Sequence, residues 1–201
     1  MRFSHFFRSI AVLLTAAVLA VSLIGCGGTA GGSKNEMPDL AQLNELFATG
    51  SWYAQALTST YDDQRSVDLS QMFYNGGSRQ PTQEEYDYVQ QQLGNPGVDV
   101  MVISREEMDL ALDTVFGLTL EETDKRGLEQ FIFREDTGCY YLCHGDTNVM
   151  SVTFTEAKAQ ANGCTALTYE GWDGLYTVTL RLDTVENGTG LVRIVKNTKA
   201  N

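Results

Sequence analysis

Residues 176–183 read Tyr-Thr-Val-Thr-Leu-Arg-Leu-Asp, and this stretch decides the fold class. Apolar and polar side chains alternate at every second position, which is the period of a β-strand with one buried face and one face in water. Alternation of this kind is typical of antiparallel sheets, where a neighbouring strand can follow after a tight turn. The C-terminal part of the chain is therefore predicted to be an antiparallel β-structure.

Similar β-rich runs fill the chain from Phe131 onward. They are separated by turn formers, of which Asn162-Gly163 and Asn187-Gly188 are the clearest. Taken in order they predict a meander of about five to six strands. We place these strands near residues 131–135, 139–144, 149–156, 164–169, 175–182 and 190–196.

The N-terminal part carries helix signals instead. Three capping boxes, in which a hydroxyl residue is followed three positions later by glutamate, are expected to open helices. A glycine that follows the second helix, Gly117, is expected to end it. Further helices are predicted after Pro38 and over residues 69–74. The three capping boxes are Thr82 with Glu85, Ser104 with Glu107, and Thr119 with Glu122.

This order of helices followed by strands predicts an α+β fold. The helices are expected to pack on one face of the C-terminal antiparallel meander. By analogy alone, the order resembles cystatin-like or NTF2-like domains, in which helices lie across a curved sheet. No internal repeat divides the chain, so residues 39–201 are predicted to be a single domain.

Residues 1–25 are predicted to be a signal peptide. Arg2 and Arg8 precede an uncharged, mainly apolar run from Ile10 to Ile24. The run is shorter than the roughly 20 residues of helix that a bilayer core requires, so it fits a signal peptide better than a permanent membrane span.

The end of this segment, Leu23-Ile24-Gly25-Cys26, resembles the bacterial lipobox. The resemblance implies that a diacylglyceryl group is attached to the thiol of Cys26 and that the chain is cleaved just before it. The alternative is an ordinary secretory signal with an incidental cysteine. Two acyl chains give stable anchoring, so the expected location is the extracytoplasmic face of the cell membrane. Residues 26–38 are then the lipidated cysteine and a flexible tether rich in glycine and small polar residues.

The charge of the chain excludes some partners. Its formal net charge is −12, and removal of residues 1–25, which hold two arginines and no acidic residue, makes it more negative. Nucleic acid is therefore not expected as a partner, because its recognition needs clustered basic residues. Most acidic pairs follow predicted helix starts, where they favour the helix dipole. No metal or cofactor is predicted.

The residues 144–148, His144-Gly145-Asp146-Thr147-Asn148, form the first candidate site. His144 is the only histidine of the mature chain, so a histidine-rich zinc site is excluded. A plain polar turn is one interpretation, since glycine, aspartate and asparagine are ordinary turn formers. The other is a ligand-contacting loop with His144, Asp146 and Asn148. The adjacent Cys143 cannot share a proton with His144, because neighbours on a strand point to opposite faces.

Aromatic residues give the binding hypothesis its other candidates. Tyrosine and tryptophan combine a large contact area with a polar handle that suits glycans or peptides. Tyr141, in the predicted strand 139–144, and Trp172, within Gly171-Trp172-Asp173-Gly174, are the two candidate contacts. A lid over the sheet edge is the alternative role for Trp172.

Two short strings resemble lipoproteins of Gram-positive anaerobes to which no activity is assigned. They are Phe73-Tyr74-Asn75-Gly76 and Tyr140-Tyr141 together with residues 144–148. The resemblance agrees with the expected location on the extracytoplasmic face of the membrane and implies no particular chemistry.

Two functions remain open from the sequence. The first is a non-enzymatic module that binds a ligand or partner of the cell envelope, through the concave sheet face or residues 144–148. The second is an envelope hydrolase that acts on cell-wall or glycan substrates, with His144 as general base and Asp146 orienting it. Catalytic motifs such as Gly-x-Ser-x-Gly and His-Glu-x-x-His are absent from the sequence, which favours the first.

Cys139, Cys143 and Cys164 are predicted to be free thiols. Cys139 and Cys143 share one predicted strand at a separation of four residues, which is about 13 Å and too far for a disulfide. In a simple meander, strand 149–156 would separate both from Cys164.

Overall fold

The computed structural model describes residues 36–77, 79–93, 98–145, 149–184 and 190–200, except for the side chains of Leu93 and His144. Residues 33–201 belong to one compact unit. The predicted signal peptide and Cys26 lie outside the described residues. Within those that are described, no helix is long and apolar enough to cross a membrane.

The larger sheet is the C-terminal meander that the alternation of residues 176–183 predicted. Its strands are antiparallel and follow one another in the order β4-β5-β6-β7. Val178 and Leu180, at the centre of β6, are fully buried, whereas Arg181 is exposed. A register shift lies between Thr179 and Leu180. The strands are β4 (Ala157–Ala159), β5 (Thr165–Gly171), β6 (Gly174–Thr184) and β7 (Gly190–Lys199).

Two other predicted strands belong to a second, smaller sheet, so the expectation of a single meander was wrong. This sheet has the order β1-β3-β2, and all of its pairs are antiparallel. Its central strand, β3 (Cys139–His144), and the short edge strand β2 (Ile132–Arg134) were expected. The third strand, β1 (Asp99–Ser104), was not predicted.

Residues 149–156 do not form the strand that was predicted for them. Their side chains alternate as expected, and Met150, Val152 and Phe154 are buried. The segment pairs with no strand, because the side chain of Asn44 takes the place of a neighbour. The Asn44 amide accepts from the Phe154 N–H at 2.7 Å and donates to its C=O at 3.0 Å.

The helices of the described residues lie between Leu40 and Gln130. The α-helices are α1 (Leu40–Leu46), α2 (Trp52–Gln55), α3 (Leu69–Met72), α4 (Gln83–Leu93) and α5 (Arg105–Phe116). Four short 3-10 helices accompany them in the described part of the chain: η1 (Ala56–Thr58), η2 (Gln64–Ser66), η3 (Leu120–Glu122) and η4 (Leu128–Gln130).

Two of the three predicted capping boxes open α-helices. The Thr82 box precedes α4, and the Ser104 box precedes α5. Gly117 ends α5 in the left-handed region, with φ of 72°, as predicted. The Thr119 box forms as well, but it opens only the single 3-10 turn η3, because Thr123 already returns to an extended backbone.

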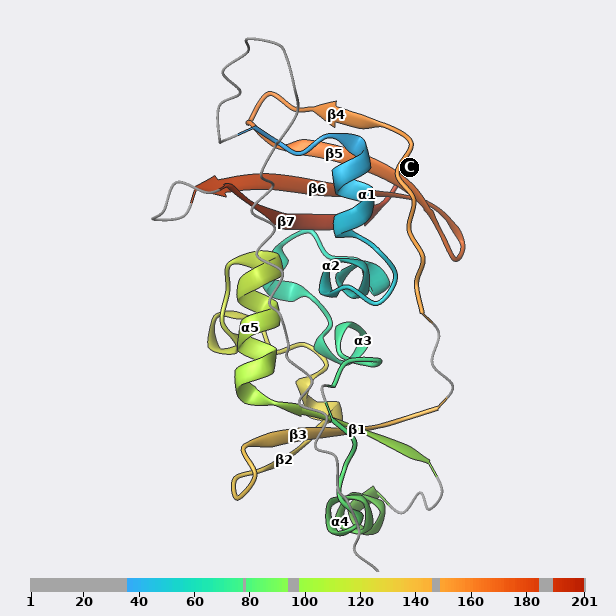
Figure 1. Ribbon diagram of the computed structural model, residues 1–201, viewed down its shortest axis with the longest axis vertical. Helices are drawn as coiled ribbons and strands as arrows, with labels where there is room; N and C mark the ends of the chain where they lie inside the picture. Colours follow the sequence, from blue (N-terminus) through green and yellow to red (C-terminus); the bar gives the residue numbers. More distant parts are fainter. Residues whose placement is uncertain (1–35, 78, 94–97, 146–148, 185–189, 201) are drawn as a thin grey trace, which may run out of the picture. The chain divides into compact units, whose positions relative to one another are not determined.

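Both sheets contribute to the main core, so the helices do not simply cover one face of one sheet. Figure 1 shows α2, α3 and α5 between the two sheets. The main cluster joins side chains of these helices to the larger sheet and to one face of the smaller sheet. On the opposite face of the smaller sheet, Val89 of α4 packs against Val100, Val102 and Tyr141 in a second cluster. The smaller sheet is therefore covered on both faces.

Cys139, Cys143 and Cys164 are free thiols. The prediction that a strand at residues 149–156 keeps Cys164 apart from the other two cysteines was wrong, since these residues form no strand. Cys139 and Cys143 lie on β3 of the smaller sheet, whereas Cys164 directly precedes β5 of the larger sheet.

Candidate binding site at the β5–β6 hairpin

The hairpin between β5 and β6 is the candidate binding site. Its last strand pair is Gly171 with Gly174, which leaves Trp172 and Asp173 as a two-residue loop. Gly174 has φ of 142°, where side chains are rarely tolerated, and a Cβ on Gly171 would lie 2.6 Å from the ring of Tyr176. Both glycines are thus needed to turn the chain this tightly.

The hairpin exposes two large apolar side chains to solvent. Trp172 is 69 % exposed and Leu175 is 55 % exposed. Single exposed apolar residues are common, but two within four residues on one tight turn form a local apolar surface. Because tryptophan is enriched among the residues that dominate binding energy at interfaces, this surface is suited to recognition.

Polar contacts at the base of the hairpin join the loop residue Asp173 to neighbouring side chains. The carboxylate of Asp173 accepts from the Tyr176 hydroxyl and from the Lys199 ammonium, the latter at 2.7 Å. The hydrogen bond from Lys199 is the main cause that lowers the pKa of Asp173. The Tyr176 ring also stacks on Tyr169, with ring centroids 5.5 Å apart. The loop is therefore tied to both β5 and β7.

A shallow polar hollow adjoins this end of β7. Its volume is about 450 Å³, and Lys199, which binds Asp173, is part of its wall. The remaining wall is formed by Thr60, Tyr61, Asp62, Lys196 and Thr198.

Trp172 and the end of β3 that carries His144 belong to different sheets. Trp172 is on the surface, as a binding contact must be. His144 ends β3, where its backbone is opposite Asp99. Its side chain and the residues Asp146 and Asn148 lie outside the described residues. Nothing in the described part of the chain therefore joins Trp172 to residues 144–148.

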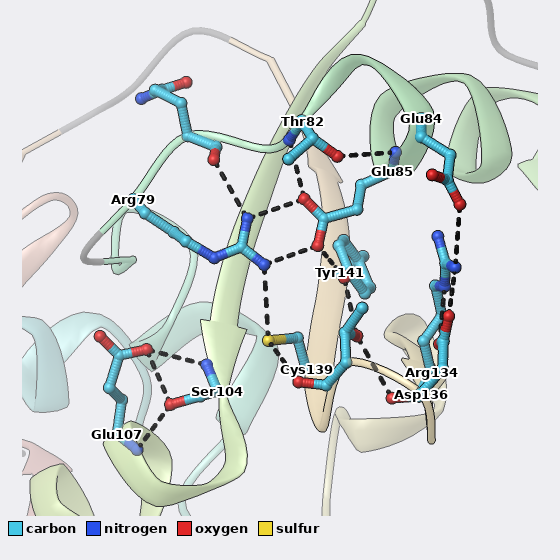
Figure 2. A network of polar contacts seen from close by, with 12 residues as sticks. Arg79, Thr82, Glu84, Glu85, Ser104, Glu107, Arg134, Asp136, Cys139 and Tyr141 are labelled. Carbon is cyan, nitrogen blue, oxygen red and sulfur yellow. Dashed lines mark hydrogen bonds and ion pairs between the residues drawn. The ribbon is translucent and has the colours of Figure 1, made fainter.

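Tyr141 is an internal residue, so its expected role as a surface contact does not apply. Its ring is fully buried in the cluster beneath α4. Figure 2 shows its hydroxyl at the centre of a polar network, where it donates to Glu85 at 2.6 Å and lies 2.9 Å from the Thr137 hydroxyl. The alternation of β3 turns Tyr141 toward α4, while Tyr140 faces the main core.

The network is built around the carboxylate of Glu85, which is 5 % exposed. Arg79 binds both of its oxygens, at 2.6 and 2.7 Å, and the backbone N–H of Thr82 donates to it at 2.7 Å. Hydrogen bonds from Arg79 are the main cause that holds the pKa of Glu85 well below its ordinary value. The carboxylate accepts four hydrogen bonds, two from Arg79 and one each from Thr82 and Tyr141, so this buried charge is paired as stability requires.

The thiol of Cys139 lies at the edge of the same network. A guanidinium N–H of Arg79 points at its sulfur at 3.7 Å, and the thiol itself donates to the C=O of Thr137 at 3.3 Å. Both contacts are internal, and Cys139 is buried. The network therefore fastens α4 to the smaller sheet.

Residues 73–76 and the loop that begins at His144 meet in the structure. The N–H of Gly145 donates to the hydroxyl of Tyr74 at 2.8 Å. Within residues 73–76, Gly76 is needed because a Cβ there would lie 2.6 Å from the Trp52 ring. The contact anchors the end of β3 to the segment that follows α3.

The inner face of the larger sheet is not available as a concave binding surface, contrary to expectation. Leu167, Val178, Leu180 and Ile194 are fully buried there. The ring of Phe154 packs edge-on against Tyr169 on the same face, with centroids 5.9 Å apart. The segment that was predicted as a strand thus helps to fill the space where a ligand was expected.

Comparison of the chain with protein-family models, with curated proteins and with solved structures finds no match. In the described part of the chain, no group of three or more histidine, cysteine, aspartate or glutamate residues could hold a metal ion.

Sequence reasoning missed the partners of Trp172. Leu175 could have been found, because it is apolar at a position where the alternation of β6 requires a residue in water. Lys199 could not, since it lies 26 residues from Asp173, and only the pairing of β7 with β6 brings the two together.

Proposed function

We propose that this protein is a non-enzymatic binding module of the cell envelope that contacts its partner through the β5–β6 hairpin. The observation that carries the proposal is the exposure of Trp172 and Leu175 on a loop fixed by Asp173, Tyr176 and Lys199. A loop that is already ordered loses little conformational entropy on binding. Less of the free energy gained from its apolar contacts is then offset. The analogy with cystatin-like or NTF2-like domains stays a prediction, and the proposal does not depend on it.

A site-specific cross-link tests this contact. Trp172 is replaced by the photoreactive p-benzoylphenylalanine in the full chain in living cells, and Leu110 is replaced in the same way as the control. Leu110 is also apolar and is 63 % exposed, but it lies on α5. We expect a discrete cross-linked product from position 172 alone. Equal products from both positions, or none from position 172, would contradict the proposal.

We also propose that lipid on Cys26 anchors the protein to the extracytoplasmic face of the membrane. The support is the lipobox-like Leu23-Ile24-Gly25-Cys26 and the glycine-rich tether that follows it. Labelling of cells with a palmitate analogue should mark the wild-type protein and not the Cys26→Ala variant. An unlabelled wild-type protein would show that the signal is an ordinary secretory one.

The hydrolase alternative has no supporting observation. It needs His144 and Asp146 next to a hydroxyl or a second carboxylate in a polar cleft. The side chain of His144 and Asp146 lie outside the described residues, so this alternative stays a prediction from the sequence.

A further inference from the structure

The backbone of β5 leaves part of its outer edge unpaired. In an antiparallel sheet, successive residues direct their N–H and C=O groups alternately to one neighbour and to the other. Gln160, which follows β4, donates its N–H to the C=O of Cys164 at 2.8 Å. Residue 164 and the even-numbered residues of β5 therefore direct their backbone groups toward β4, and Glu170 is one of these.

β4 is too short to reach Glu170. It pairs only with Thr165, Ala166 and Leu167, whereas β5 continues to Gly171. No hydrogen bond from the described residues reaches the N–H or the C=O of Glu170 at this edge. Natural sheets protect such edges with short strands and lysines, and β4 with Lys158 has both features. Since β4 pairs with β5 only as far as Leu167, it does not protect the edge at Glu170.

The unpaired edge and the apolar surface are parts of one hairpin. Glu170 is directly opposite the exposed Leu175, and the exposed Trp172 follows two residues later. An added strand would thus find backbone partners and apolar contacts within a few residues. Main-chain bonds supply affinity in this mode of peptide recognition, and side-chain contacts supply specificity.

We propose that the hairpin binds an extended, basic peptide segment of a partner protein, which adds a strand to the larger sheet beside Glu170. The inference rests on the proposed function of the hairpin and specifies its partner. A lysine or arginine opposite Glu170 would form the favourable cross-strand pair, and an apolar residue would lie near Trp172. The net charge of −12 attracts a basic segment as well.

A second copy of this chain is a poorer occupant of the same edge. Two copies related by a twofold axis would bring Glu170 close to the Glu170 of the other copy. Like charges opposite one another on neighbouring strands are destabilising.

A model peptide tests strand addition. The probe is fluorescein-labelled Thr-Lys-Val-Lys-Thr-Lys-Val-Lys, whose lysines share one face of an extended strand. The comparison peptide has the same sequence, but the backbone nitrogen of each lysine carries a methyl group. The side-chain charges are kept, whereas the backbone N–H groups that would bond to β5 are lost. We expect fluorescence anisotropy with the full chain to show binding that N-methylation weakens by about tenfold or more.

Charge reversal provides the matched test on the protein. In Glu170→Lys, the probe should bind about tenfold more weakly, and a peptide with glutamate in place of lysine should bind more tightly than to the wild type. Glu129→Lys makes the same change of charge at an exposed residue of η4 and should leave probe binding almost unchanged. Circular dichroism verifies that both variants are folded.

Equal binding of the plain and N-methylated peptides, or equal effects of the two charge reversals, would overturn the inference in favour of general electrostatic attraction. Absence of probe binding would overturn it too. If cross-linking at position 172 persisted in either case, the hairpin would remain a binding site, but strand addition would be wrong.

Discussion

The two sheets use their polar groups in opposite ways. In the smaller sheet both faces are covered, and the carboxylate of Glu85 beneath α4 is surrounded by donors. In the larger sheet the β5–β6 hairpin leaves Trp172 and Leu175 in water, while Asp173 and Lys199 only hold the loop in place.

This difference separates stability from recognition. A buried charge is costly unless it is paired, so the Glu85 network must be complete for α4 to stay on the sheet. An exposed tryptophan contributes little to the stability of the fold. The free energy of burying its apolar surface is gained only when a partner covers it. Substitutions at the two places should therefore have different consequences.

The largest loss of stability is expected for Glu85→Ala. The change leaves the guanidinium of Arg79 and the hydroxyl of Tyr141 without their shared acceptor. Because the Arg79 side chain is 41 % exposed, we expect a loss of about 3 kcal/mol, at the lower end of what breaking a fully buried ion pair costs. Urea denaturation measures the effect. Glu84→Ala is the control, because this neighbouring side chain is 86 % exposed and its loss should change stability by less than about 0.5 kcal/mol. Similar losses in both variants would show that the network is not what holds α4.

The same network predicts a loss of stability in acid. The pKa of Glu85 is lowered in the folded protein, so its contribution is fully present above the ordinary value of 4.5 and declines as the pH falls below it. Denaturation midpoints measured between pH 7 and pH 3 should therefore fall less steeply for Glu85→Gln than for the wild type. Parallel curves would mean that Glu85 titrates normally in the folded chain.

A smaller effect is expected for Tyr141→Phe. The ring stays in the core, but Glu85 and Thr137 lose the hydroxyl, and a hydrogen bond to a charged group contributes about 1.5–3 kcal/mol. Thermal denaturation followed by circular dichroism measures it. If Tyr141 instead contacted a ligand, the change would weaken binding and leave stability unaltered.

Loss of the α5 cap should be smaller still. Ser104→Ala removes the hydroxyl that accepts from the Glu107 N–H at 3.1 Å, and loss of such a cap costs about 0.5–2 kcal/mol. Chemical denaturation should show a lower midpoint with an unchanged slope. An unchanged midpoint would show that the box does not stabilise the start of α5.

The smallest effect on stability is expected for Trp172→Ser, within about 0.5 kcal/mol, because the side chain is largely in water already. Probe binding measured by anisotropy should nevertheless weaken. A large loss of stability would show instead that the tryptophan is a lid that packs on the sheet edge.

Local patterns allowed much of the fold to be predicted. The alternation along β6 is confirmed at Val178 and Leu180, which are buried, and at Arg181, which is exposed, whereas Thr179 beside the register shift is buried against expectation. The Ser104 box and Gly117 are confirmed because caps depend on residues that are close in sequence. Of the candidate site, Trp172 was found from its turn, Gly171-Trp172-Asp173-Gly174.

Two failures have a common cause in tertiary contacts. β1 is an apolar run without alternation, because Met101 and Ile103 face the main core while Val100 and Val102 face α4. Periodicity alone cannot identify a strand that is buried on both faces. Residues 149–156 fail in the opposite way, because they alternate like a strand but pair with none. Their apolar side chains pack on the core, and the side chain of Asn44 bonds to the backbone of Phe154.

By itself the sequence determined the α+β class, the starts of α4 and α5 and the order of β5, β6 and β7, and it offered Trp172 either as a contact or as a lid over the sheet edge. These depend on neighbours within a few residues. Only the tertiary structure decided that there are two sheets, that Tyr141 is internal, that Lys199 fixes Asp173 and that β4 stops short of Glu170. The physical reason is that each of these depends on which distant segments pair, and the free energy of such pairing is a property of the whole core.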